Sequence, residues 1–328
     1  MQQTSRRLFG VLMGASAALA VGIGFGSGAA QAFPERPITF VAPYNPGGTV
    51  DPTARITAAA VSEILGQPVV VENRAGAAGT VGTDYVVRSD ADGYTVLIHT
   101  NVIASEACLK SDLPYDFGEQ MVSVANLVET PFAILVHPDV PAQSLEELVA
   151  LAQDNPGDLL YGAAGVGSSG HLRGEQFKVA QEVEMDFIPY SGGADTLAAL
   201  AGGEIQVAFD TLVGSVAMLA DGRVRPLAVS TAERWPTQPD IPTMQELGFA
   251  SLENQWIGAF VPAGTPEDRI AVLEAAFMEA LQREDVIEQF ARINFAIAGD
   301  GAEATDAHLA EETAMWCDVI GQAGITLD

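Results

Sequence analysis

Short runs of β-branched and aromatic residues alternate along this chain with longer segments of helical periodicity. Strand-like runs at 38–42, 68–71 and 94–98 are separated by helical patterns at 54–65 and 79–88. A strand followed by a helix and another strand is the repeating unit of α/β proteins. The first third of the chain therefore predicts a largely parallel sheet with helices packed on its faces.

The second half of the chain repeats this alternation. Strand-like runs lie at 133–136, 159–162, 186–189, 205–209 and 224–230, and helical patterns lie between them at 144–153, 170–179 and 194–201. A further strand-like run at 256–261 precedes two or three helical patterns that begin at Pro266. We therefore expect an α/β protein of two lobes, with more than one strand crossing between them and a ligand cleft between the lobes. The expected division is lobe 1 at 33–132, lobe 2 at 133–255, and a return to lobe 1 with the C-terminal helices at 256–328.

The first 32 residues have the pattern of a cleavable signal peptide. Arg6 and Arg7 precede an uncharged, glycine-rich apolar run, which ends in the small residues of an A-x-A site at 30–32. The segment at 5–9 also fits the twin-arginine type of export signal. We predict cleavage after Ala32 and a periplasmic location for the rest of the chain.

Acidic residues dominate the charge of the chain, which has 43 Asp and Glu, 15 Lys and Arg, and a net charge of −28. This field disfavours nucleic acid and anionic membranes as partners. It also repels an anionic ligand, so such a ligand must be held by local dipoles such as clusters of backbone N–H groups. Cys108 and Cys317 are the only cysteines, which excludes a disulfide framework and a cysteine-based metal site and leaves a single bridge open.

A glycine-rich turn joins the first strand-like run to the first helical pattern. Gly47 and Gly48 lack side chains, so a ligand can approach the backbone there, beside a helix N-terminus with unpaired N–H donors. Asp51 suits a helix cap, and we weight that role above ligand contact. The turn fits a carboxylate site, although a simple tight turn explains the glycines equally well.

A second glycine-rich loop, at 161–172, again lies between a strand-like run and a helical pattern. Its glycines at 165, 167 and 170 match the dinucleotide-binding fingerprint. That fingerprint normally opens a domain, whereas this one lies mid-chain in a protein predicted to be exported. The same geometry serves any anion, and Ser168 and Ser169 add hydroxyl donors. Two equivalent cradles, one in each lobe, indicate a ligand with two acidic ends.

The sequence shows no pattern of catalytic or metal-binding side chains. Neither Ser168 nor Ser169 has both glycines of the Gly-x-Ser-x-Gly elbow of serine hydrolases. The histidines show no metal-ligand spacing with one another or with acids; they are His99, His137, His171 and His308. We therefore expect no enzyme activity, no cofactor and no metal.

Ordered motifs from Phe33 onward carry a family resemblance. They are Phe33-Pro34-x-Arg36-Pro37-Ile38, Pro46-Gly47-Gly48-x-x-Asp51-x-x-Ala54-Arg55, Leu65-Gly66-Gln67-Pro68 through Gly79, Asp92-Gly93-Tyr94-Thr95, Leu113-Pro114-Tyr115-Asp116, Tyr161-Gly162 through His171-Leu172, Pro189-Tyr190-x-Gly192, Asp240-Ile241-Pro242-Thr243 and Pro262-Ala263-Gly264-Thr265-Pro266. In these motifs the chain resembles the extracytoplasmic solute receptors of the tripartite tricarboxylate transporter family, also called Bug proteins. The resemblance implies a two-lobed type II periplasmic-binding-protein (venus flytrap) fold.

The resemblance also implies which residues bind the ligand. Family members hold carboxylates on the two glycine-rich loops, largely through backbone N–H groups and ordered water. Carried over, the candidates are Tyr44, Gly47, Gly48, Thr49 and Asp51 in the first loop, Gly165, Gly167, Ser168, Ser169 and His171 in the second, and Thr100, Asn101 and Tyr190 in the walls. For His171, packing at the start of its helix is favoured over ligand contact.

Two further residues have competing interpretations. Asp210, at the end of a strand, is a candidate for binding an amino or hydroxyl group of the ligand, and a cap or an interlobe hydrogen bond is the equal alternative. Arg173 departs from the family pattern of a small residue after His-Leu. A solvated helix position is favoured for it over a cation aimed at the ligand.

The sequence thus predicts a periplasmic solute-binding protein, a monomer that captures a small di- or tricarboxylate for the membrane permease subunits of a tripartite tricarboxylate transporter. Two alternatives stay open. One is a ligand-sensing subunit for a histidine kinase, and the other is an exported enzyme that uses the Gly/Ser loop.

Overall fold

The computed structural model describes residues 33–109 and 113–325. The predicted signal peptide at 1–32 and its cleavage site lie outside the described residues. Within the described ranges, none of the helices has the length and apolar character needed to cross a membrane.

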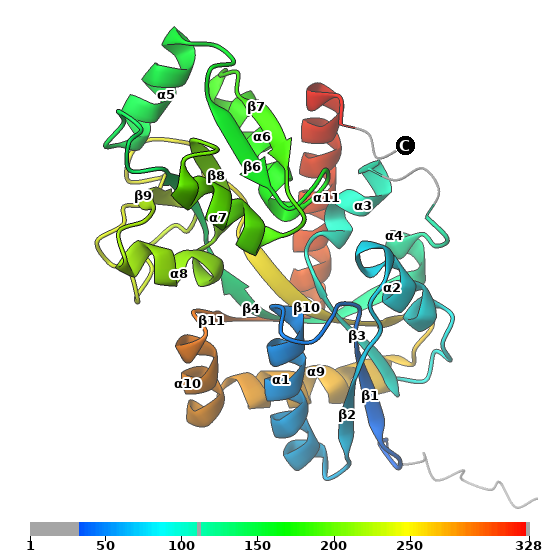
Figure 1. Cartoon of the computed structure of the whole chain (residues 1–328). Helices are drawn as coiled ribbons and strands as arrows, with labels where there is room; N and C mark the ends of the chain where they lie inside the picture. Colours follow the sequence, from blue (N-terminus) through cyan, green and yellow to red (C-terminus); the bar gives the residue numbers. More distant parts are fainter. Residues whose placement is uncertain (1–32, 110–112, 326–328) are drawn as a thin grey trace, which may run out of the picture. The chain divides into compact units, whose positions relative to one another are not determined.

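Lobe 1 is built on a six-stranded sheet with the strand order β11–β4–β10–β3–β1–β2 (Figure 1). Its strands are β1 (Ile38–Ala42), β2 (Val69–Asn73), β3 (Thr95–Thr100), β4 (Met121–Thr130), β10 (Gln255–Pro262) and β11 (Ala296–Gly301). Its helices are α1 (Val50–Leu65), the 3₁₀ turn η1 (Ala77–Gly79), α2 (Thr80–Val87), α3 (Ile103–Leu109), α4 (Phe117–Gln120), α9 (Glu267–Leu281), α10 (Glu284–Arg292) and α11 (Ala302–Ala323). Helices α1 and α9 pack against each other, and Phe40 of β1 stacks on Phe277 of α9 with ring centroids 5.4 Å apart.

Lobe 2 is built on a five-stranded sheet with the strand order β7–β6–β8–β5–β9 (Figure 1). Its strands are β5 (Phe132–Val136), β6 (Leu160–Ala163), β7 (Asp186–Pro189), β8 (Val207–Thr211) and β9 (Arg225–Val229), and its helices are α5 (Leu145–Asp154), α6 (Ser169–Gln181), α7 (Gly193–Gly202) and α8 (Leu212–Ala220). Ser144 caps helix α5, because its hydroxyl accepts a hydrogen bond from the N–H of Glu147 at 3.3 Å. Tyr161, Phe177 and Phe209 are buried in one core of this lobe.

The two lobes repeat one local arrangement, as the sequence predicts. In lobe 1, β1 pairs in parallel with β2 and β3, and β3 then pairs antiparallel with β10. In lobe 2, β6 pairs in parallel with β7 and β8, and β8 then pairs antiparallel with β5. Each glycine-rich loop follows the central parallel strand of its lobe, so the two loops occupy equivalent places.

The three strands predicted in the first third of the chain pair in parallel as expected, but each complete sheet is mixed. Strand β10 runs antiparallel to β3 and β4, and β5 runs antiparallel to β8 and β9. The chain passes from the first sheet to the second between β4 and β5 and returns before β10. These crossing strands run against the parallel strands of the lobe that they enter. Strand β4 was also missing from the predicted strands, because it is buried along almost its whole length and shows no clean alternation.

The C-terminal helix α11 joins elements of both lobes. It packs against α3 and β4 of lobe 1 and against α6 of lobe 2. Cys108 of α3 and Cys317 of α11 form a disulfide, with their Cα atoms 5.3 Å apart. The pairing that the sequence left open is therefore made, and it ties α3 to α11 across 209 residues of chain.

The disulfide predicts a large loss of stability on reduction. A crosslink that closes so long a loop restricts the unfolded chain, so removing it is expected to lower the free energy of unfolding by roughly 2 to 5 kcal/mol. Urea denaturation with and without a reducing agent measures this difference. The Cys108→Ser/Cys317→Ser variant is the control, because a reducing agent should have no effect on it. Equal stability of the oxidised and reduced protein would contradict the prediction.

Candidate functional site

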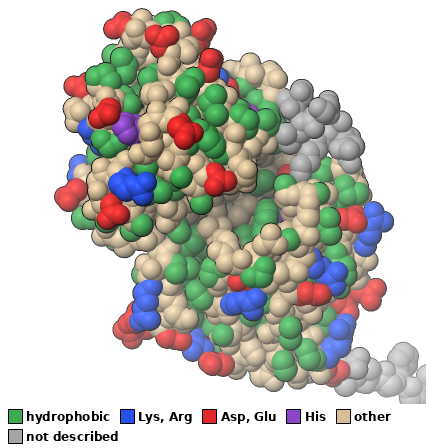
Figure 2. All heavy atoms as spheres, viewed as in Figure 1, with side chains coloured by type: hydrophobic (Ala, Val, Ile, Leu, Met, Phe, Trp, Pro, Cys, Tyr) green, Lys and Arg blue, Asp and Glu red, His purple; other side chains and the backbone are tan. Residues whose placement is uncertain are grey.

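A cavity of about 390 Å³ lies between the two glycine-rich loops. Figure 2 shows the surface hollowed between the lobes at this place. The cavity is lined by Tyr44, Gly48, Thr49, Val50, Ala78, Thr100, Val102, Glu106, Leu109, Ala164, Val166, Gly167, Ser168, Ser169 and Gln255. We call it the apolar compartment, because aliphatic side chains make up much of its wall.

A second cavity, of about 230 Å³, adjoins the first on the side of lobe 2. Its lining residues are Thr49, Phe132, Ala163, Ala164, Ser168, Ser169, Gly170, Gly193, Thr196, Phe209, Asp210, Thr211 and Gln255. We call it the Asp210 compartment. The two compartments share Thr49, Ala164, Ser168, Ser169 and Gln255, which mark their junction.

The first glycine-rich loop is braced by the helix that follows it. Gly47 has a left-handed φ of 92°, and its N–H donates to Oδ2 of Asp51, in the first turn of α1, at 3.3 Å. Oδ1 of Asp51 lies 3.0 Å from Nδ2 of Asn73 and 2.9 Å from Nη2 of Arg55. Burial alone would raise the pKa of Asp51, but these hydrogen bonds and the Arg55 charge hold the pKa below its ordinary value. The Asp51 carboxylate therefore shapes the loop.

The second glycine-rich loop is held by the same kind of hydrogen bond, from a glycine N–H to a side chain in the first turn of the next helix. Gly167 has a left-handed φ of 76°, and its N–H donates to Nδ1 of His171, in the first turn of α6, at 3.1 Å. His171 is 5% exposed, and burial lowers its pKa, which keeps the ring neutral and Nδ1 an acceptor. The Ser168 hydroxyl caps α6 by accepting from the N–H of His171 at 3.4 Å. In both lobes, a side chain four residues after a left-handed glycine holds that glycine's N–H.

The bracing brings two helix N-termini to one junction. The first N–H groups of any α-helix have no partner within the helix and carry a partial positive charge. Thr49 and Val50 at the start of α1 line the apolar compartment from lobe 1, and Ser168 and Ser169 at the start of α6 line it from lobe 2. The arrangement suits an anionic group held by neutral donors from both lobes.

Comparison with known proteins places the chain in a family. Residues 53–325 match the family model described as the tripartite tricarboxylate transporter family receptor. The chain belongs to this family. The predicted resemblance is thereby confirmed, and the family is one of solute receptors.

Similar proteins span nearly the whole receptor. BugT of Bordetella pertussis is 32% identical over 301 residues, which cover 91% of this chain and 92% of that protein. The solved structure of Rpa4515 from R. palustris with adipate is 34% identical, has a TM-score of 0.78, and covers 90% of this chain and 100% of its own. MatC from Rhodopseudomonas palustris with bound malate is 30% identical, has a TM-score of 0.73, and covers 88% of this chain and 100% of its own. These likenesses confirm the two-lobed fold of the periplasmic binding proteins.

The sequence-predicted site residues divide into two groups. Eight line the compartments: Tyr44, Gly48, Thr49, Thr100, Gly167, Ser168, Ser169 and Asp210. Six others do not line them: Gly47, Asp51, Gly165, Asn101, His171 and Tyr190. Gly47, Asp51 and His171 belong to the braces. Tyr190 packs near Gly162 of β6, and Asn101 belongs to a network behind the cleft.

Several lining residues had no signal in the sequence. Gln255 is the first residue of β10, and its Nε2 donates to the Thr49 hydroxyl at 3.1 Å, which joins the return crossing to the start of α1. Glu106 of α3 is 2% exposed and accepts a hydrogen bond from the Tyr115 hydroxyl at 2.9 Å. Neither position stands out by residue type or spacing. The return of the chain to lobe 1 brings Gln255 to the cavity, whereas Glu106 reaches it on α3, which follows β3 within lobe 1.

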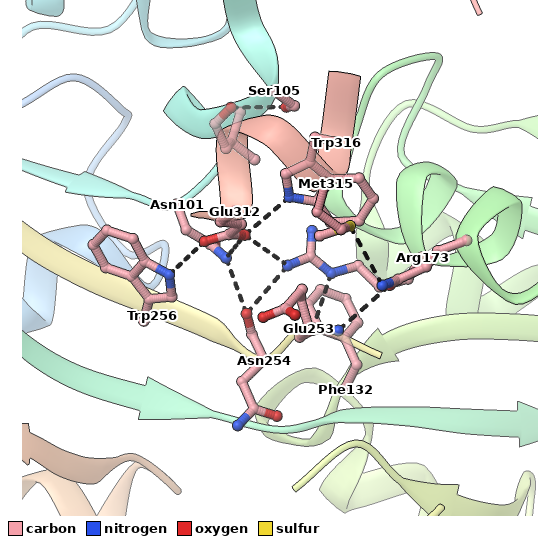
Figure 3. A network of polar contacts seen from close by, with 12 residues as sticks. Asn101, Ser105, Phe132, Arg173, Glu253, Asn254, Trp256, Glu312, Met315 and Trp316 are labelled. Atoms are coloured by element: carbon pink, nitrogen blue, oxygen red, sulfur yellow. Dashed lines mark hydrogen bonds and ion pairs between the residues drawn. The ribbon is translucent and has the colours of Figure 1, made fainter. Parts of the chain in front are cut away.

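Arg173 lies in a buried network between the lobes (Figure 3). Its side chain is 1% exposed, so the interpretation as a solvated residue is wrong. Arg173 lines neither compartment, which argues against a cation aimed at the ligand. Its Nε donates to the carbonyl of Glu253 and its Nη2 to the carbonyl of Asn254, each at 3.1 Å. Nη2 also lies 3.8 Å from Oε1 of Glu312 in α11. Burial lowers the pKa of Arg173 to about 10, which leaves the guanidinium charged at neutral pH.

The Glu312 carboxylate accepts three hydrogen bonds from side chains of lobe 1. It accepts from Nδ2 of Asn101 at 2.6 Å, from Nε1 of Trp256 at 2.7 Å and from Nε1 of Trp316 at 2.9 Å. Asn101 directly follows Thr100, which lines the apolar compartment. The network therefore connects α6, the segment that returns to lobe 1, and the end of β3.

Asp210 is the second-last residue of β8 and is the one charged side chain among the described residues that line its compartment. Its Oδ1 accepts from the N–H of Thr211 at 2.6 Å and from the Thr211 hydroxyl at 3.4 Å. Within the described part of the chain, no donor forms a hydrogen bond with Oδ2. Burial raises the pKa of Asp210 to about 6, although the Thr211 hydrogen bonds oppose the rise.

The Arg173 network predicts strong coupling between its two charges. Arg173→Met leaves the carbonyls of residues 253 and 254 and the Glu312 carboxylate without their buried cation, so the free energy of unfolding should fall by about 3 to 5 kcal/mol. Adding Glu312→Gln to that variant should cost less than Glu312→Gln costs in the native background. Chemical denaturation of the four proteins measures the coupling. Additive losses would contradict it.

The raised pKa of Asp210 predicts a pH-dependent stability cost. The folded state binds the Asp210 proton more tightly than the unfolded state, so the cost is absent below the ordinary pKa of 3.8 and complete above about 6. The difference corresponds to about 3 kcal/mol at most. Without ligand, Asp210→Asn should therefore stabilise the protein at pH 7.5 and not near pH 4. Thermal unfolding at both pH values tests this, with the exposed Asp195→Asn as control. An equal gain at both pH values would contradict the prediction.

Proposed function

We propose that this receptor binds a small carboxylate at the junction of its two compartments and delivers it to the membrane permease of a tripartite tricarboxylate transporter. The observation that carries the proposal is the pair of braced helix N-termini, α1 from lobe 1 and α6 from lobe 2, at one junction. A carboxylate has two oxygens and accepts hydrogen bonds from both sides. The relatives solved with adipate and with malate support the same ligand class.

The charge of the site explains why backbone and hydroxyl groups must hold the ligand. Among the described residues that line the two compartments, none is Lys or Arg. The chain as a whole carries a net charge of −28. Attraction therefore depends on the first N–H groups of α1 and α6 and on the hydroxyls of Thr49, Ser168 and Ser169. These donors contact the ligand directly, whereas most of the acidic residues are distant and are screened by salt. The short-range attraction can therefore exceed the repulsion from the net negative charge.

Binding at this junction favours closure of the lobes. A ligand that contacts α1 and α6 together stabilises the arrangement in which both lobes touch it, because its affinity for that arrangement is higher. Such a receptor releases its ligand when the lobes separate. No chemical change of the ligand is part of this proposal.

The proposal includes the predicted export and organisation of the chain. The sequence of the first 32 residues supports a signal peptide of the twin-arginine type, cleavage after Ala32 and work in the periplasm. The proposed receptor works there as a monomer. The lobe boundaries at 33–132, 133–255 and 256–328 are part of the same proposal.

A charge placed at the cap of α6 tests the carboxylate site. Asp and Asn both cap helices as well as Ser does, so Ser168→Asp and Ser168→Asn should retain the fold. The variants differ in the charge at the junction. Ser168→Asp should weaken carboxylate binding at least 100-fold relative to Ser168→Asn, because the new carboxylate repels the ligand.

A panel of aliphatic, hydroxylated and aromatic acids, screened by thermal shift, identifies a ligand for this comparison. A ligand at 100 times its Kd adds about 2.7 kcal/mol to the stability of the native protein. Calorimetric titration of that ligand into the two variants then measures the ratio. Equal affinities would remove the start of α6 from the site, and no response to any acid would overturn the proposed function.

A further inference from the structure

The Asp210 compartment presents an acceptor where a second ligand carboxylate would have to sit. Asp210 lies between the starts of two helices of lobe 2. A Cβ added at Gly193, the first residue of α7, would lie 3.3 Å from Oδ2, and α8 begins at Leu212, two residues after Asp210. Oδ1 is occupied by Thr211, and Oδ2 has no hydrogen-bond donor among the described residues.

A second carboxylate is a poor fit for this compartment. Two like charges at close separation repel each other strongly, and partial burial increases the repulsion. The compartment has a volume of about 230 Å³, so a carboxylate placed in it cannot move far from Asp210. A buried carboxylate is stable when a cation or a strong donor pairs with it. No described lining residue supplies that cation, so the ligand is the available source.

The shape of the site has three branches that meet at the junction. The helix N-termini of α1 and α6 hold an anion at the junction itself. The Asp210 compartment offers an acceptor on one side. The apolar compartment, with Val50, Val102, Leu109 and Val166 in its wall, offers room for an uncharged chain on the other. A carbon atom that bears a carboxylate, a cation and a side chain matches these three branches.

Building on the proposed function, we infer that the receptor is specific for an α-amino acid: its carboxylate lies at the junction, its ammonium group pairs with Oδ2 of Asp210, and its side chain enters the apolar compartment. This assignment places an ammonium group, and not a second carboxylate, in the Asp210 compartment. Asp210 is then the residue that determines specificity.

Matched sets of ligands test the inference on the native protein. Each set contains an amino acid, its deaminated analogue and its hydroxyl analogue: leucine, 4-methylpentanoate and 2-hydroxy-4-methylpentanoate; aspartate, succinate and malate; glutamate, glutarate and 2-hydroxyglutarate; phenylalanine, 3-phenylpropionate and 3-phenyllactate. Calorimetric titration should show at least one amino acid binding tenfold or more tighter than both analogues. The N-acetyl derivative of that amino acid, which lacks the positive charge, should lose at least the same factor.

A matched pair of variants links the preference to Asp210. Asp210→Asn keeps the shape of the side chain and removes its charge, so the ratio of affinities between the amino acid and its deaminated analogue should fall at least tenfold. Asp195→Asn makes the same change on the exposed face of the first turn of α7 and should leave the ratio unchanged.

The outcomes separate this inference from the proposed function. Binding of succinate, malate or another non-amino acid as tightly as its amino counterpart overturns the inference and leaves the proposed function intact. An amino-acid preference that survives in Asp210→Asn also overturns it. The absence of binding by every acid, with or without an amino group, overturns both.

Discussion

The buried contact between Arg173 and Glu312 is the interaction on which the arrangement of the two lobes depends. Arg173 belongs to α6 of lobe 2, and Glu312 belongs to α11, which packs against lobe 1. The carbonyls that Arg173 binds lie where the chain returns to lobe 1. Helix α6 begins with the Ser168 cap, so the network that holds this helix also positions one wall of the cleft (Figure 3). A buried charge with many partners suits this role, because each partner must be in place for the charge to be tolerated.

An acidic protein that binds an acid has to separate its own charges from the ligand's. In each glycine-rich loop of this receptor, one side chain holds the loop in place, and separate backbone N–H groups are left to bind the ligand. Asp51 and His171 hold the N–H groups of Gly47 and Gly167, so each loop keeps its left-handed glycine. The donors at the helix starts stay available at the junction. The charged Asp51 is bound by Arg55 and Asn73 and does not line either compartment.

Much of the local structure could be predicted from the sequence. The strand, glycine loop and helix of each lobe were predicted because periodicity and glycine placement act over a few residues. The sequence did not decide whether the disulfide forms, because Cys108 and Cys317 are 209 residues apart and their spacing cannot show that α3 packs on α11. The burial of Arg173 could not be predicted from the sequence for the same reason. Its partners come from 253, 254 and 312, so its burial depends on contacts that no helical pattern records.

The sequence by itself determined the α/β alternation, the two glycine-rich loops, the acidic charge and the family to which the chain belongs. These properties arise from neighbouring residues or from ordered motifs, and they need no knowledge of how distant segments meet. The tertiary structure alone decided that the sheets are mixed, that Gln255 and Glu106 line the cleft, and that Asp51 and His171 act as braces. The physical reason for the mixed sheets and for the place of Gln255 is the double crossing of the chain between the lobes, which sets strand direction and brings residues far apart in sequence to one cavity. The two braces and the place of Glu106 depend on the three-dimensional path of the loops and helices within each lobe, which residue types alone do not specify.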